Sequence, residues 1–329
     1  MPSIPVYLSL RDEAIAVTGG GSTPKIVKIS NRNLSSLTPY GSIIITCGVI
    51  FIVLLSNILE RWVLRMVYKE TYRNLEKGEN ERRRRSFTYY HVGALMLFSL
   101  FCTGVYPVLM FLVGPGDFGT HVGRKGGGAT IGDMLFLFAE IYTAYYLYEM
   151  CFRTQFASPL TIAHHVGLLL VVQTSVALFA DSDSHKEATL EFYMCMVWGA
   201  FDVVVEMPIF VSMIVWRVKR HNHKLLANIG LGCCIWILVA ATTEVVVTIY
   251  LLNRSWHRWG TVFRVITPVV FTLWIATQLY GAYRLYGMGR AQLQEHRKAS
   301  GSIESESIES GISEPERAKT KVLETKVSE

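Results

Sequence analysis

Long apolar runs recur along the chain, and charged residues gather between them. The runs lie at about 42–59, 91–113, 131–150, 160–180, 191–216, 225–251 and 262–286. Each is close to or above the ~17–25 residues that a helix needs to cross a hydrocarbon core of ~30 Å. A soluble domain can bury one such run, but hardly all of them. The pattern therefore predicts an all-α fold, a multi-pass transmembrane helical bundle with about seven spans.

The polar segments between the runs divide the chain into five parts. Residues 1–40 form a polar outer tail, 41–68 contain the first transmembrane helix, and 69–86 form a charged cytoplasmic linker. The other six runs fall within 87–290, which predicts a six-helix membrane domain. Residues 291–329 are rich in serine and glutamate and poor in large apolar groups, so this tail is predicted to be disordered.

Composition agrees with a membrane protein, because 51% of the 329 residues are hydrophobic. The formal net charge of +6 comes largely from residues beside the apolar runs, among them the four arginines at 82–85. Such a placement indicates an orientation signal and contact with anionic lipids rather than binding of nucleic acid. The six cysteines lie in or beside the runs without a Cys-x-x-Cys pair, which indicates packing rather than a disulfide framework or a zinc site.

Basic residues near the ends of the runs predict the orientation. With the N-terminus on the outer, lumenal side, the cytoplasmic segments carry about twice as many lysines and arginines as the outer ones. The sequons "NLS" at Asn33 and "NRS" at Asn253 both fall on the outer side and are candidate glycosylation sites. The C-terminal tail is then cytoplasmic. Its serines stand in an acidic context, so either phosphorylation or a purely solubilising role fits Ser302, Ser305, Ser307, Ser310 and Ser313.

Several polar residues lie inside the apolar runs. An ionisable group at membrane depth costs ~2.5–3.5 kcal/mol or more unless it faces a cavity or a partner. The residues are Glu140, Tyr145, Glu149, His164, His165, Gln173, Asp202, Glu206, Glu244 and Gln278. A polar interior shared by the six-helix unit would accommodate them together.

Helical spacing groups these residues into faces. Thr161, His165 and Gln173 fall within one arc of a helix, and Asp202 and Glu206 project together because they are four residues apart. Tyrosines and a carboxylate form a further stripe, made of Tyr142, Tyr145, Tyr146 and Glu149. The spacing therefore predicts hydroxyl and carboxylate groups that turn inward from neighbouring spans.

A neutral imidazole beside a carboxylate can act as a general base or as a nucleophile towards an activated acyl group. His164, His165, Asp202 and Glu206 are therefore candidate catalytic residues. Candidate substrate-binding residues are Glu140, Tyr145, Glu149, Gln173 and Glu244. A structural role, as packed and hydrogen-bonded residues, is the main alternative. No metal site is expected, since adjacent histidines on a helix diverge by ~100° and cannot easily chelate one ion.

The histidine pair also carries a family resemblance. A "HH" early in a predicted span precedes an apolar run ("AHHVGLLLVV"), and an acidic helix ("WGAFDVVVEMPIF") follows some 35 residues later. In these features residues 87–290 resemble the TLC-domain membrane proteins, which include the ceramide synthases. The plan of one anchor helix and six further spans, the outer N-terminus and the serine-rich acidic tail are also similar to ceramide synthases.

The resemblance implies a chemistry. His164 and His165 stand at the positions of the paired histidines of the family, and Asp202 at the second acid of its Asp-x-x-Asp motif. Ceramide synthases transfer an acyl group from acyl-CoA to a sphingoid amine, which implies acyl-CoA and a long-chain amine as substrates, no bound cofactor, and the endoplasmic reticulum as location. The pattern departs at Gly199, which replaces the first acid, and at Trp198, which replaces a histidine that often precedes it. Catalytic activity therefore stays open.

Three functions fit the sequence. The first is a lipid-handling enzyme, an acyltransferase acting on a long-chain amine. The second is a non-enzymatic lipid-binding, transport or membrane-composition protein of the same family, which uses the same cavity. The third is a seven-span receptor, which is disfavoured because the chain has neither "DRY" nor "NPxxY". Membrane lipids are expected partners in each case, whereas the sequence leaves the lipid, the reacting histidine and the oligomeric state open.

Overall fold

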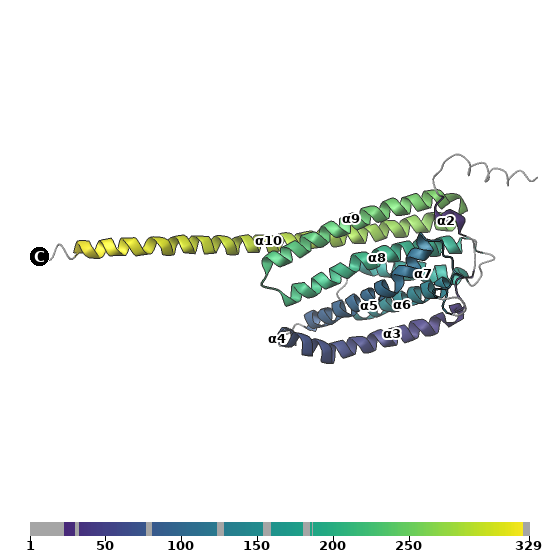
Figure 1. Cartoon of the computed structure of the whole chain (residues 1–329), viewed down its shortest axis with the longest axis horizontal. Coiled ribbons are helices and arrows are strands. Elements are labelled where there is room, and N and C mark those ends of the chain that lie inside the picture. The colour runs from purple at the N-terminus through teal and green to yellow at the C-terminus, as the bar shows by residue number, and fades with distance from the viewer. Residues whose placement is uncertain are drawn as a thin grey trace, which may run out of the picture.

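The computed structural model describes residues 23–29, 33–76, 81–123, 128–153, 159–179, 185 and 187–324, with the backbone alone after residue 300. These residues are almost entirely helical, apart from turns and one isolated bridge between His121 and Thr130. The long helices lie side by side in one elongated bundle (Figure 1). The fold is therefore an all-α multi-pass membrane bundle, as the apolar pattern predicts.

The helices follow one another in alternating directions. Short elements come first: α2 (Lys25–Lys28) and the 3-10 turn η2 (Thr38–Tyr40). The first long stretch comprises α3 (Gly41–Ile58), a π-helical turn η3 (Leu59–Val63) and α4 (Leu64–Glu76). The next helices are α5 (Glu81–Leu112), α6 (Ile131–Arg153), α7 (Pro159–Leu178), α8 (Ala188–Val218) and α9 (His223–Ser255). A 3-10 turn, η5 (Trp256–Arg258), leads to α10 (Thr261–Glu324). We call the two ends of the bundle the α2 end and the α4 end, after the elements there (Figure 1).

Among the described residues, six helical stretches are long and apolar enough to cross a membrane. Helix α6, with 23 residues, is not among them, although the sequence predicts a span at 131–150. The reason is its polar content, since α6 carries Asp133, Glu140 and Glu149. Its neighbours α3, α5 and α7 cover it on several sides, and Glu140 and Glu149 are buried. A helix enclosed in this way does not need a uniformly apolar surface.

Helix α7 occupies a central position. It contacts α6, α8 and α10, whereas α3 packs mainly on α6, α5 on α8, and α9 on α10. Helix α7 therefore has three other helices packed against it. This placement allows residues far apart in the sequence to surround the two imidazole rings.

Two details show how the bundle satisfies its own packing and hydrogen bonds. A Cβ added to Gly230 would lie 3.0 Å from the Cα of Gly289, so glycines allow the close approach of α9 and α10. Pro208, inside α8, cannot donate a hydrogen bond to the carbonyl of Val204. The indole Nε1 of Trp236 in α9 donates to that carbonyl instead, at 3.3 Å.

The segment before α2 lies outside the described residues up to residue 22, but α2 itself is docked on the bundle. The Nζ of Lys25 donates to the carbonyls of Met110 and Gly114 at 3.1 and 3.0 Å, and also to that of Gly116. A cation at the C-terminus of α5 satisfies carbonyls that have no partner within the helix. Burial lowers the pKa of Lys25, and nearby Asp117 opposes this shift.

The two charged segments are more helical than the composition suggests. The predicted linker at 69–86 is largely taken up by α4 and the beginning of α5, with a break at Lys69, where φ is +33°. Helix α10 runs on beyond the last apolar run to Glu324 (Figure 1). The five candidate phosphorylation serines fall on this extension, and their side chains lie outside the described residues.

Candidate functional site

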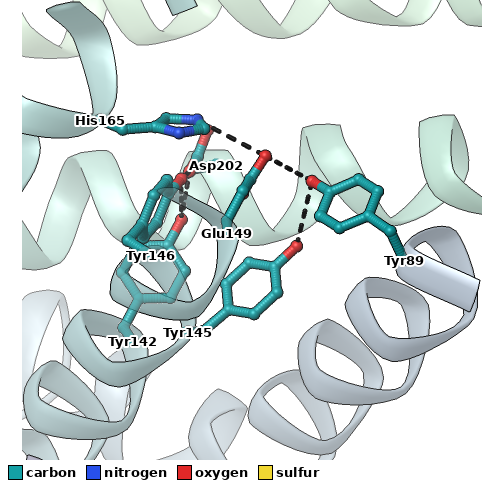
Figure 2. Close-up of polar contacts among 7 residues, drawn as sticks. All are labelled: Tyr89, Tyr142, Tyr145, Tyr146, Glu149, His165 and Asp202. Carbon is teal, nitrogen blue, oxygen red and sulfur yellow. Dashed lines mark hydrogen bonds and ion pairs between the residues drawn. The ribbon is translucent and has the colours of Figure 1, made fainter. Parts of the chain in front are cut away.

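The site lies where α5, α6, α7 and α8 meet, towards the α4 end of the bundle. Figure 2 shows seven of its residues, and their imidazole, carboxylate and hydroxyl groups turn towards one another. Helix α7 provides His165, α8 provides Asp202, and α5 provides Tyr89. Helix α6 provides Glu149 and three tyrosines from one stripe of its surface, Tyr142, Tyr145 and Tyr146.

Glu149 is the carboxylate beside His165. Its Oε1 lies 3.9 Å from Nε2 of His165, and both side chains are buried. The same oxygen accepts a hydrogen bond of 2.5 Å from the hydroxyl of Tyr89. A distance of 3.9 Å is longer than a hydrogen bond, but it allows strong attraction once the imidazole carries a proton, because the surroundings have low polarity.

Asp202 is held by two tyrosines. The hydroxyls of Tyr142 and Tyr146 both donate to its Oδ2, the latter at 2.6 Å, and the two hydroxyls lie 3.1 Å apart. The ring of Tyr146 also packs edge-on against the imidazole of His165, with 4.7 Å between centroids. Tyr146 therefore links the carboxylate of α8 to the histidine of α7.

His164 faces a different neighbour. Its ring packs edge-on against the indole of Trp274 in α10, with 4.5 Å between centroids. The two imidazole rings lie 5.4 Å apart. The adjacent histidines thus diverge, as helical geometry requires, and each contacts a different helix.

A cavity of about 250 Å³ brings the candidate catalytic residues together. We call it the polar cavity. Its wall includes all four of these residues and several other polar ones: His164, His165, Asp202, Glu206, Glu149, Thr161, Gln278 and Arg284. The structure therefore gathers the predicted residues around one hollow, which is the geometry that a shared site requires.

The other candidate substrate-binding residues lie apart from this hollow. The amide of Gln173 donates to Glu140 and to Thr143, each at 3.0 Å, in a separate cluster between α7 and α6. The amide of Gln278 donates to buried Glu244 at 2.8 Å. Gln278 lines the polar cavity, and Glu244 lies behind it, outside the cavity wall. Tyr145 is fully buried, with its hydroxyl 3.5 Å from that of Tyr89.

Three residues of the site, Tyr89, Tyr142 and Tyr146, are not among the candidate catalytic or substrate-binding residues that the sequence suggests. Tyr142 and Tyr146 belong to a stripe that the spacing predicts, but nothing in the sequence assigns their hydroxyls to Asp202. Tyr89 follows the arginine run at the beginning of α5 and gives no signal in the sequence. Its role depends on the packing of α5 against α6, which only the tertiary structure provides.

A second cavity, of about 180 Å³, lies among α5, α6, α7 and α8. We call it the apolar cavity, because Leu, Val, Phe and other apolar residues provide nearly all of its wall. Tyr142 lines it, and the hydroxyl of Tyr142 donates to Asp202 in the polar cavity. Gly199 lines the apolar cavity as well, and a Cβ added there would meet nothing within 4 Å.

Among the described residues, no group of three or more histidine, cysteine or acidic side chains could hold a metal ion. Imidazole, carboxylate, phenol and guanidinium groups are among those that line the polar cavity. Comparisons of the chain with protein-family models, with curated proteins and with solved structures find no match.

Proposed function

We propose that this chain is a lipid-handling membrane protein that transfers an acyl group from acyl-CoA to a long-chain amine. The observation that carries the proposal is the link through Tyr142, which lines the apolar cavity and donates to Asp202 in the polar cavity. One cavity is polar and its neighbour is apolar, and an amphiphile likewise has a polar head and an apolar chain. Its head would lie beside His165 and Asp202, and its chain would lie in the apolar cavity.

The space for a chain continues beyond the apolar cavity. A groove of about 1130 Å³ begins near Lys25 at the α2 end and runs between α5 and α8. The groove and the apolar cavity share Leu109, Ala200 and Val204 in their walls. A long hydrocarbon chain gains free energy from such a surface in proportion to the apolar area that it buries. This continuity supports a lipid as the ligand.

In the proposed reaction, the nitrogen of the amine attacks the carbonyl carbon of the thioester. His165 accepts the proton that the nitrogen loses as the C–N bond forms. The C–S bond then breaks, and the leaving sulfur takes the proton back from His165, so that an amide and a free thiol result. The cycle returns the imidazole to its neutral form.

The neighbouring groups support this role of His165. Glu149, at 3.9 Å from Nε2, stabilises the imidazolium that forms in the middle of the cycle. The two tyrosine hydroxyls on Asp202 fix the orientation of that carboxylate, which is then available to accept a hydrogen bond from the neutral amine. Glu149 therefore joins Asp202 and Glu206, which the sequence suggests, as a carboxylate that can balance the charge of the histidine.

A second function is a non-enzymatic lipid-binding or transport protein that uses the same two cavities. The observation that favours it is the position of Gly199, which lines the apolar cavity rather than the polar one. The first acid of the TLC motif therefore has no counterpart at that position. A protein with this wall can bind an amphiphile without turning it over.

Turnover of purified protein separates the two functions. The full-length protein in mild detergent is incubated with palmitoyl-CoA and sphinganine, and the amide is measured by mass spectrometry. We expect product from the wild type and a loss of about 100-fold or more in His165→Ala. His121→Ala, which changes an exposed histidine in a loop, is the matched control. Co-purified lipid without turnover in the wild type would favour the second function, and neither turnover nor bound lipid would reject both.

A further inference from the structure

A third cavity, of about 410 Å³, lies at the α4 end of the bundle. We call it the arginine cavity. Its wall includes Ser56, Glu60, Arg82, Arg83, Arg85 and Arg217, which come from α3, η3, α5 and α8. Among the described residues, four guanidinium groups and one carboxylate line this hollow. That carboxylate, on Glu60, is 3.3 Å from a fifth arginine, Arg84, so the described side chains around the cavity carry an excess of positive charge.

Arg217 is fixed in place from three directions. Its Nη2 donates to the hydroxyl of Ser86 at 2.7 Å, and its Nη1 donates to the carbonyl of Met213 at 3.1 Å. Its guanidinium also lies over the ring of Tyr90, 4.6 Å from the centroid. A positioned guanidinium loses little conformational freedom when an anion binds. The cavity therefore has a positioned cation on one wall and three further arginines on the wall formed by the first turns of α5.

The arginine cavity also lies at a defined depth. Glu60 follows the end of the first apolar run at 59, the arginines at 82–85 precede the run that begins at 91, and Arg217 follows the run that ends at 216. All three helices therefore change from apolar to charged at this level. The phosphate groups of a bilayer lie at such a boundary, and arginine forms paired hydrogen bonds with phosphate oxygens.

We propose that the arginine cavity binds a phosphate monoester, carried either by the headgroup of an anionic lipid or by a soluble phosphate compound. The phosphate oxygens would accept hydrogen bonds from Arg82, Arg83 and Arg85 on one side and from Arg217 on the other. The hydroxyl of Ser86 at the cavity wall is a further hydrogen-bond donor, whereas the hydroxyl of Thr88 donates to the carbonyl of Arg84. This site goes beyond the proposed acyl transfer and does not depend on it, because no residue of the proposed reaction lines the arginine cavity.

The arginine cavity nevertheless lies next to the polar cavity. Tyr90 lines both, and neighbouring Tyr89, which lines the arginine cavity, donates to Glu149 of the polar cavity. A phosphate bound at the arginines would therefore lie one layer of side chains away from the proposed reacting groups. A bound anion could therefore affect the groups of the polar cavity through Tyr89 and Tyr90.

The test measures binding to the full-length protein in detergent at constant ionic strength. The probes are dioctanoyl phosphatidylinositol 4-phosphate, as a lipid headgroup, and inorganic pyrophosphate, as a soluble anion. One variant replaces three arginines together (Arg82→Gln, Arg83→Gln, Arg85→Gln), and the matched control removes three charges from α10 (Arg290→Gln, Arg297→Gln, Lys298→Gln). We expect about fivefold weaker binding for each arginine removed from the cavity, and so about 100-fold for the triple variant, against little change in the control.

The outcomes distinguish the sources of the phosphate. Loss of lipid binding alone assigns the site to a headgroup, loss of pyrophosphate binding alone assigns it to a soluble compound, and loss of both supports the shared chemistry. Unchanged binding in the triple variant, or an equal loss in the control, overturns the proposal. Should the triple variant fail to fold, the single variant Arg83→Gln, at an exposed position, must still weaken binding about fivefold, and unchanged binding there rejects the site.

Discussion

The carboxylate of Glu149 lies 3.9 Å from Nε2 of His165, although the two residues belong to different helices and are 16 positions apart. Both side chains are buried, and the partner of Glu149 on its other side is the hydroxyl of Tyr89. The imidazole therefore has a buried carboxylate within reach, on a helix other than its own.

The pair gives a first prediction. Under the proposed acyl transfer, Glu149→Gln removes the charge that stabilises the imidazolium, so we expect kcat to fall about 10- to 100-fold with little change in KM. Glu149→Asp keeps the charge and is expected to recover part of the rate. Equal losses in Gln and Asp variants would point to packing rather than charge as the contribution of Glu149.

The two tyrosines on Asp202 give a second prediction. Tyr142→Phe or Tyr146→Phe leaves a buried carboxylate with one hydrogen bond fewer, so each is expected to cost about 1.5–3 kcal/mol of stability. Thermal unfolding in detergent measures the effect. Tyr106→Phe, which changes a tyrosine that is 57% exposed, serves as the control. In an Asp202→Asn background the cost of Tyr146→Phe should shrink, and an unchanged cost would show that the hydroxyl acts elsewhere.

Pro208 and Trp236 give a third prediction. Trp236→Phe removes the donor to the carbonyl of Val204 that the proline leaves without its helical partner, which we expect to cost about 1 kcal/mol. Adding Pro208→Ala should remove this cost, because alanine provides the N–H that can donate to Val204. The change in thermal unfolding midpoint is the readout, with Trp62→Phe, 71% exposed, as control. Additive effects of the two substitutions would contradict the coupling.

The contact of α9 with α10 gives a fourth prediction. Gly230→Ala places a Cβ about 3 Å from the backbone of α10, and overpacking of this kind costs about 1–3 kcal/mol. Gly232→Ala is the matched control, since a Cβ there meets nothing within 4 Å. We expect a lower unfolding temperature for the first variant only. Similar stability of both variants would mean that the helices separate without cost.

The orientation gives a fifth prediction. Asn33 and Asn253 are both exposed, and both lie at the α2 end of the bundle. If that end faces the lumen, a glycan on Asn33 should retard the protein on a gel, and either glycosidase treatment or Asn33→Gln should remove the shift. Serine at position 36, which lies outside the sequon, provides a control in Ser36→Ala. A cytoplasmic α2 end predicts no shift in any of these samples.

Several features of the fold follow from the sequence alone. The spacing of the apolar runs indicates where the long helices lie, because a bilayer requires ~20 apolar residues for each crossing, although α5 and α10 extend beyond their runs. The spacing within a helix determines which residues share a face, as with the polar arc of α7 and the pair Asp202 and Glu206. Both features are local, and a period of 3.6 residues is sufficient to derive them.

Only the tertiary structure determines which side chains from different helices contact one another. Nothing in the sequence identifies Glu149 as a neighbour of His165, because that contact depends on the rotation and depth of α6 relative to α7. The same relation between helices places Tyr89 on Glu149 and Gly199 in the apolar cavity. Contacts between helices arise from side-chain packing across the whole bundle, whereas a sequence pattern records only the helix to which a residue belongs.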